Sequence, residues 1–85
     1  MFLEIVTPDE KVFEGEVQSA SFPGSDGSFQ ILNNHAPLIS TLGKGGIRLE
    51  KLVDKRLEEE NWMVDGGIVE VLNNKVTVLA EKISQ

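Results

Sequence analysis

The sequence contains no cysteine and a single histidine, His35. Without thiols there can be no disulfide bond, thiolate metal site or cysteine nucleophile, and one histidine excludes a multi-histidine zinc site within one chain. No apolar run approaches the roughly 20 residues that a membrane-spanning helix needs. Residues 1–5 also lack the basic start and apolar stretch of a signal peptide. We therefore expect a cytoplasmic location without direct membrane insertion.

Basic residues are scarce, with 8 Lys and Arg against 14 Asp and Glu and a net charge of -6. This balance argues against nucleic acid or an anionic lipid surface as the partner. A length of 85 residues allows one domain, residues 1–85. The content of 40% hydrophobic and 26% charged residues is that of an ordinary globular domain. A basic or polar protein surface is the partner that fits best.

Short apolar segments separated by glycine, proline and asparagine predict an all-β sandwich or barrel. The clearest hairpin joins residues 68–72 to 75–80 through Asn73 and Asn74, because asparagine tolerates the positive φ angles of a two-residue turn. In its second strand, Val76, Val78 and Ala80 share one face. The other expected strands are residues 3–5, 11–13, 17–22, 29–32, 38–42 and 47–52, and a segment running through Trp62 and Val64.

Residues 51–60 fit a helix and a strand alike. Leu49, Leu52, Val53 and Leu57 recur at helical intervals, and Lys, Arg, Leu and Glu are good helix formers. The pattern of the whole chain favours two strands with a turn near residues 53–55. The local pattern alone leaves both structures open.

The glycine-rich segments do not match nucleotide-binding motifs. Gly43-Lys44 lacks the earlier glycine and the following hydroxyl residue of a phosphate-binding loop, so we interpret residues 43–46 as a tight reversal of the chain. Gly66-Gly67 is not followed by a helical pattern, which excludes a dinucleotide fingerprint. Two adjacent glycines entering a strand indicate a bulge or a close backbone contact.

His35 could act as a general base in principle, but the sequence has no nucleophile elbow and no second histidine. The candidate orienting carboxylates would be Asp26 or Glu70, and the candidate nucleophiles would be Ser25, Ser28 or Ser40. A loop anchor or interface residue is the simpler role for His35. The acidic run 58–60 lacks the spacing of a calcium loop. We predict no catalytic, cofactor-binding or metal site. The function classes that remain are binding and a structural role.

Several segments together resemble the epsilon subunit of F-type ATP synthases. They are Leu3-Glu4-Ile5-Val6-Thr7-Pro8, Val12-Phe13-Glu14-Gly15-Glu16-Val17, Asp26-Gly27-Ser28-Phe29, Asn34-His35-Ala36-Pro37-Leu38, Asp65-Gly66-Gly67-Ile68-Val69-Glu70-Val71 and Val76-Thr77-Val78-Leu79-Ala80-Glu81. The resemblance covers the whole chain and rests on the order and spacing of the motifs. Ser28 and Gln30 depart from it, standing where many members have glutamate and glycine.

The resemblance implies a flattened sandwich of about ten short strands in two sheets. It implies a non-catalytic subunit of the rotor, peripheral at the cytoplasmic face of the membrane, that joins the gamma subunit to the polar loops of the proteolipid ring and couples proton transport to ATP synthesis. The residues expected to face the ring are Asp26, Gly27, Ser28, Asn34, His35 and Ala36. Those expected to face gamma are Thr7, Ser40 and Leu42.

Two further expectations follow from the same comparison. Family members usually continue into a helical hairpin that inhibits hydrolysis, whereas this sequence stops at Gln85, so we expect the 85-residue form neither to bind ATP nor to inhibit. The alternative function is a free-standing β-sandwich module that binds a peptide or sugar. Measuring the affinity of this chain for the gamma subunit would distinguish a rotor subunit from a free-standing binding module.

Overall fold

The computed structural model describes residues 1–85 and consists of strands and turns without a helix. The all-β prediction is thereby confirmed. The strands are β1 (Phe2–Val6), β2 (Lys11–Glu16), β3 (Ser19–Gly24), β4 (Gly27–Leu32), β5 (Leu38–Val53), β6 (Arg56–Leu72), β7 (Lys75–Ala80) and β8 (Ile83–Ser84).

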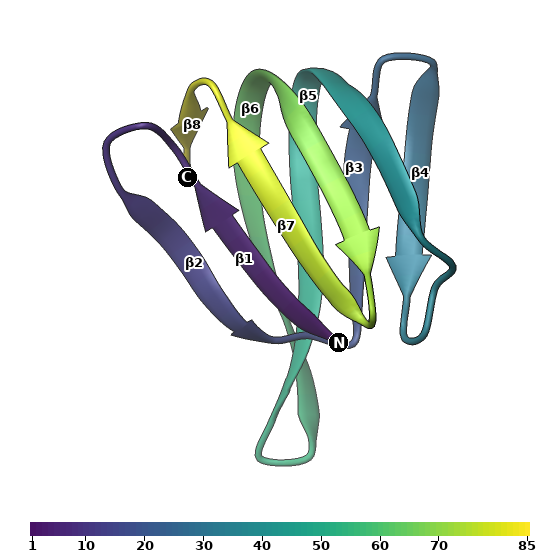
Figure 1. The fold of residues 1–85 in the computed structure, drawn as a ribbon. Coiled ribbons are helices and arrows are strands. Elements are labelled where there is room, and N and C mark those ends of the chain that lie inside the picture. The colour runs from purple at the N-terminus through teal and green to yellow at the C-terminus, as the bar shows by residue number, and fades with distance from the viewer.

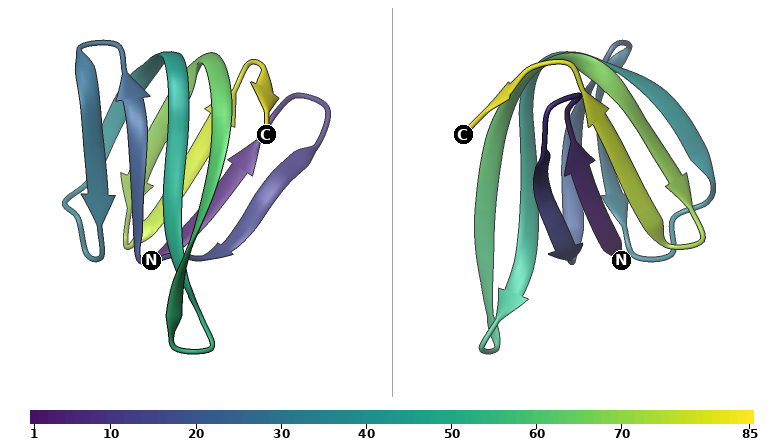
Figure 2. Two further views of the ribbon diagram at one scale, coloured as in Figure 1. Left: turned by 180° about the vertical axis from the view of Figure 1, so that it is seen from behind. Right: turned by 60° about the vertical axis from the view of Figure 1, so that its left-hand side comes forward.

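All strands belong to one hydrogen-bonded sheet in the order β2-β1-β7-β6-β5-β3-β4, with β8 paired to β6. Strands β5 and β6, of 16 and 17 residues, pair antiparallel from Leu38 opposite Val71 to Val53 opposite Arg56, with Gly43 and Gly66 at the bend unpaired. The sheet folds over across these two strands, so that its two ends face each other as the layers of a sandwich (Figures 1 and 2). Strand β1 pairs in parallel with β7, near the other end of the chain.

The family resemblance led us to expect about ten strands in two sheets, and the structure has eight strands in one hydrogen-bonded sheet. The expected strands 38–42 and 47–52 are both parts of β5, and β6 likewise runs unbroken through Gly66 and Gly67. The prediction that residues 43–46 reverse the chain is therefore wrong. Glycine has no Cβ to oppose a sharp bend, so the strand passes from one layer to the other without ending.

The region 51–60 forms two strands, as the whole-chain pattern indicated, and no helix. The turn lies at Asp54 and Lys55, whose φ angles are 49° and 66°. Asn73 and Asn74, with φ angles of 51° and 60°, form the predicted turn between β6 and β7. Paired positive φ angles at both central residues are typical of the turn that suits the right-handed twist of a hairpin.

The core follows the alternation read from the sequence. Val76, Val78 and Ala80 of β7 are buried, whereas Leu79 between them is exposed. Trp62, which is 4% exposed, belongs to the core and meets the ring of Phe13 edge-on at a centroid distance of 5.5 Å. Each large apolar side chain buried in this way stabilises the fold by roughly 1.5–3 kcal/mol relative to an exposed one. The core fills the space between the layers.

We predict that Gly67→Ala destabilises the protein by about 2 kcal/mol or more. Gly67 has a φ of 149°, and a Cβ there would collide with the carbonyl oxygen of Leu79; backbone strain of this kind costs roughly 1–3 kcal/mol. The matched control is Gly43→Ala in the same bend, where the nearest atom to a Cβ, the Pro23 carbonyl oxygen, is 3.8 Å away. Urea unfolding measures both, and equal stabilities for the two variants would contradict the prediction.

Candidate functional site

The first group of predicted surface residues lies in the turn from β3 to β4. The two strands pair as far as Gly24 and Gly27, so the turn is tight, and Gly27 has a φ of 127°. Thr41 of β5 stabilises the turn through two hydrogen bonds to Ser25. The Thr41 carbonyl oxygen accepts from the Ser25 N–H at 3.1 Å, and the Thr41 hydroxyl donates to Ser25 Oγ at 2.9 Å. Asp26 is exposed and forms no ion pair within the chain. The turn therefore presents an uncompensated negative charge.

The second group lies in the loop from β4 to β5, where residues 33–37 are exposed. Asn34 adopts a φ of 62°, and the His35 N–H donates to the Leu32 carbonyl oxygen at 3.2 Å. The His35 ring contacts the Ala36 carbonyl oxygen through Nδ1 at 2.7 Å. This contact fixes the imidazole on its own loop.

The structure does not bring these two groups together. Asp26, Gly27 and Ser28 lie where β4 begins, and Asn34, His35 and Ala36 follow its end, so the groups occupy opposite ends of the molecule (Figures 1 and 2). One flat partner surface cannot contact both ends through these residues. The same separation keeps His35, the candidate general base, away from the candidate nucleophiles Ser25 and Ser28. The hydroxyl of the third candidate, Ser40, donates to the Thr41 carbonyl oxygen at 3.2 Å.

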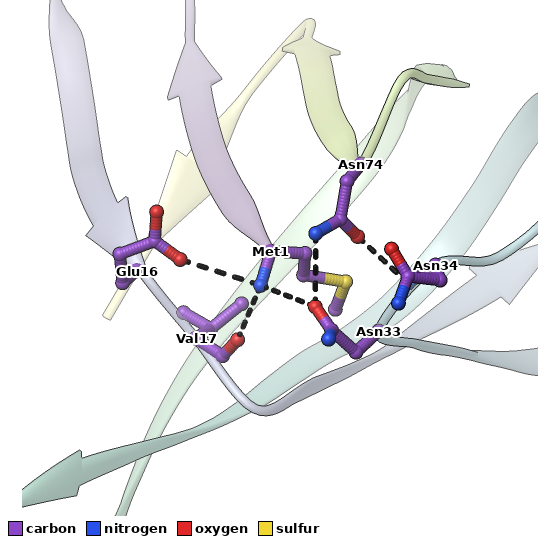
Figure 3. Close-up of polar contacts among 6 residues, drawn as sticks. All are labelled: Met1, Glu16, Val17, Asn33, Asn34 and Asn74. Carbon is purple, nitrogen blue, oxygen red and sulfur yellow. Dashed lines mark hydrogen bonds and ion pairs between the residues drawn. The ribbon is translucent and has the colours of Figure 1, made fainter.

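A set of asparagine side chains holds the second loop in place (Figure 3). Asn74 Oδ1, in the turn between β6 and β7, accepts from the Asn34 N–H at 2.7 Å. Asn74 Nδ2 donates to Asn33 Oδ1 at 3.0 Å. Asn74 thus joins two loops that are far apart in the sequence, an interaction that the turn motif alone does not reveal.

The expected gamma-facing residues need a correction. Leu42 is 5% exposed and belongs to the core, so its side chain does not lie on the surface. Ser40 is two residues earlier in β5 and lies on the same inward side. The Thr7 hydroxyl accepts from the N–H groups of Asp9 and Glu10, both at 3.2 Å, and thereby stabilises its own turn.

The opposite side of these strands carries apolar side chains that sequence reasoning missed. Ile39 is 72% exposed, and Ile68, Leu72 and Leu79 are also exposed. Cross-strand partners share a face of the sheet, and the register pairs Val6 with Leu79, Leu79 with Ile68, Ile68 with Thr41, and Ile39 with Glu70. We call the surface formed by Val6, Ile39, Ile68, Leu72 and Leu79 the apolar outer face.

The apolar outer face continues into a shallow hollow of about 320 Å³ at the ends of β1 and β7. Its lining includes Val6, Thr7, Pro8 and Leu79. A signal for this face was present in the sequence, since Ile68, Leu72 and Leu79 are apolar at the positions that alternate with the buried valines. Contiguous exposed apolar surface of this kind marks an interaction site.

Ion pairs elsewhere on the surface are exposed or half-buried. Glu14, at 2.8 Å, and then Glu4 raise the pKa of Lys11 above its ordinary value by accepting hydrogen bonds from it. Glu60 raises the pKa of Lys51 in the same way. No group of three or more His, Asp or Glu side chains is placed to hold a metal ion. No helix capable of spanning a membrane is found.

We predict that Asn74→Gly lowers stability by about 1–2 kcal/mol, because it removes two hydrogen bonds of the asparagine set while glycine still adopts a positive φ. Amide hydrogen exchange at Asn34 should accelerate at the same time. The control is Asn73→Gly in the same turn, whose side chain makes no hydrogen bond to the protein and whose loss should be nearly neutral. An unchanged exchange rate at Asn34 in Asn74→Gly would argue against the prediction.

Known proteins match this chain throughout its length. The profile of the family described as ATP synthase, Delta/Epsilon chain, beta-sandwich domain matches residues 1–85. The ATP synthase epsilon chain of Chlorobium limicola is 46% identical over 82 residues, which are 96% of this chain and 90% of the relative. The epsilon chain of Salinibacter ruber is 37% identical, and its match covers 95% of this chain but 58% of the relative.

Two solved structures share the fold at low sequence identity. One is the central stalk and c-ring of the Tetrahymena thermophila mitochondrial ATP synthase, with a TM-score of 0.83 and 16% identity over 99% of this chain and 65% of that one. The other is the Euglena gracilis mitochondrial ATP synthase, with a TM-score of 0.86 and 18% identity over 96% of this chain and 51% of that one. The alternative of a free-standing peptide- or sugar-binding module is not favoured by these relatives. With residues 1–85 matched by the family profile and 96% of the chain matched by a bacterial epsilon chain, the chain belongs to the delta/epsilon family of ATP synthases and makes up its β-sandwich domain.

Proposed function

We propose that this chain is the non-catalytic epsilon subunit of the central stalk in an F-type ATP synthase. In this role it joins gamma to the polar loops of the proteolipid ring, so that proton-driven rotation of the ring reaches the catalytic head. The observation that carries the proposal is the apolar outer face on a domain of this family. Its bacterial relatives support a peripheral position at the cytoplasmic face of the membrane.

The proposed role needs a stiff body, because a flexible link would lose rotation between the ring and the head. The domain has 52 backbone hydrogen bonds, of which 44 lie within the strands. Strands β5 and β6 take part in both layers, so one long hairpin, paired on both sides of its bend, joins the layers. Close packing of the core adds low compressibility.

Gamma, on this proposal, docks on the apolar outer face. Ile39, Ile68 and Leu79 lie on three neighbouring strands, so they form one patch. Polar groups such as Glu70 and Thr77 lie within the same face, which gives the patch hydrogen-bonding capacity as well as apolar area. The mixed composition resembles that of an interface core with polar neighbours.

The ring contact is assigned to the turn at Asp26, Gly27 and Ser28. Polar loops of proteolipids in this family typically expose a basic or amide side chain, and Asp26 is an exposed carboxylate without a partner in its own chain. The loop at Asn34, His35 and Ala36 offers no negative charge. Charge complementarity therefore favours the Asp26 end.

We predict that Ile39→Asp and Ile68→Asp each weaken binding to isolated gamma by roughly tenfold or more, because an anchor side chain in an interface contributes at least about 1–2 kcal/mol. Titration calorimetry with purified gamma measures the affinity. Leu57→Asp is the matched control, since Leu57 is 61% exposed on the β5–β6 hairpin, outside this face. Weakening by the control alone would place gamma on the hairpin, and tight binding by all three variants would reject the apolar outer face.

We predict that Asp26→Lys lowers proton-driven ATP synthesis of the assembled enzyme by roughly tenfold or more, because like charges facing each other across an interface cost several kcal/mol. The control is His35→Lys, which places the same side chain in an exposed loop at the other end. Both variants should keep their affinity for gamma. Loss of synthesis in His35→Lys and not in Asp26→Lys would move the ring contact to the Asn34 loop.

A further inference from the structure

Strands β2 and β4 are the two ends of the sheet order, and each of them pairs with one neighbouring strand. An edge strand presents unpaired N–H and C=O groups to which another chain can bind, and charged side chains are a common protection against this. The six residues of β2 include Lys11, Glu14 and Glu16, whereas the six residues of β4 carry no charge. Strand β4, at the right-hand margin of the sheet in Figure 1, is therefore an edge without this protection.

The backbone groups of β4 that point away from β3 belong to every second residue. The two strands pair up to Gly24 and Gly27, with a two-residue turn between them. In such a hairpin the pair next to the turn exchanges hydrogen bonds, and so does every second pair after it. The intervening residues of β4 are Ser28, Gln30 and Leu32, so their N–H and C=O groups point outward. The Leu32 carbonyl oxygen indeed accepts from the loop after β4, at 3.2 Å.

We propose that the β4 edge binds the β4 edge of a second copy of this chain, in antiparallel pairing around a two-fold axis at Gln30. In this register Gln30 lies opposite Gln30 of the other copy, and Ser28 lies opposite Leu32. These are the residues whose backbone groups point outward, so each free N–H of one copy meets a C=O of the other. The strand is thus complementary to itself, as a two-fold interface requires.

The two ends of this seam supply charge complementarity. Asp26 precedes Gln30 by as many residues as Asn34 follows it, so the antiparallel register brings each Asp26 turn beside the Asn34 loop of the other copy. Asp26 forms no ion pair in its own chain. The loop carries amide and imidazole groups and no acidic side chain, and the Asn34 side chain makes no hydrogen bond in its own chain. Its amide is free to donate to the Asp26 carboxylate.

The same comparison explains why the opposite edge does not serve. Pairing of two β2 strands would bring Glu14 and Glu16 of two acidic chains together, and like charges opposite each other are destabilising. Pairing at β4 covers the Asp26 turn, so it belongs to the free chain and competes with the proposed contact to the ring. The inference does not rest on the proposed function, because it uses only β4 and the turns at its two ends.

A disulfide tests both the pairing and its register, because the chain has no cysteine of its own. Gln30→Cys places two thiols directly opposite, where paired residues have Cα atoms about 5.5 Å apart, a distance that a disulfide spans. On mild oxidation this variant should form a covalent dimer at least several-fold faster than Ser28→Cys. A mixture of Ser28→Cys and Leu32→Cys chains should link to each other. Equal rates for Gln30→Cys and Ser28→Cys alone would overturn the proposal.

Sedimentation equilibrium of the cysteine-free chain measures the association itself. Its apparent mass should rise with concentration toward that of two chains, and Gln30→Lys should weaken the association by roughly tenfold or more, because it sets like charges opposite each other. Asn61→Lys is the matched control, since it changes the net charge equally at an exposed position on β6, away from this edge, and should leave the association unchanged.

Two results would contradict the proposal in this measurement. A chain that stays monomeric up to millimolar concentration would show that the β4 edge does not bind a second copy. An association that survives Gln30→Lys and is lost in Ile68→Asp would place the second copy on the apolar outer face instead of the β4 edge.

Discussion

The bend in the β5–β6 ladder is the constraint on which the rest of this structure depends. The two strands stay paired on both sides of it, with Leu42 opposite Gly67 and Lys44 opposite Asp65. Pairing can continue through so sharp a change of direction only where side chains do not collide, and glycines supply that condition on both strands. Because the pairing resumes on both sides of Gly43 and Gly66, the two layers cannot move apart without losing hydrogen bonds. The sandwich is thus one folded sheet, and its stiffness does not rest on the core alone.

This continuity also determines which surfaces remain available to partners. Inward positions on both layers are filled by the core, so a partner meets either an outer face or an end. The outer face over β1, β7, β6 and β5 is partly apolar, whereas the ends are polar turns. An apolar face suits a permanent partner whose contact buries area, and a polar turn suits a contact that is weaker and more dependent on charge. The domain offers both kinds of surface on one rigid body.

The sequence predicted the strands well where the pattern was local. Alternation located the buried valines of β7, and Asn73-Asn74 identified its hairpin, because both signals depend on neighbouring residues. The reversal expected at residues 43–46 was wrong because glycine permits a turn and a bent strand equally, and the choice is made by pairing with β6. Leu42 was misplaced for a related reason: its face is decided by the register of the long hairpin. The opposite locations of Asp26 and His35 follow from the strand between them, β4, which the sequence predicted at residues 29–32 and which the grouping by resemblance left out of account.

At the end of the sandwich that carries Asn33, Asn34 and Asn74, hydrogen bonds between loops hold the chain in place. Loops at such an end are exposed, so burial contributes little to holding them, and hydrogen bonds between loops must do so. Asn74 contacts Asn33 and the backbone of Asn34, and Asn33 in turn accepts from the Met1 ammonium. A charged donor makes a hydrogen bond stronger than a neutral one does, so the amino group is well suited to be the centre of this set. The same oxygen of Asn33 accepts from both donors, so this one side chain joins the start of β1 to the turn between β6 and β7.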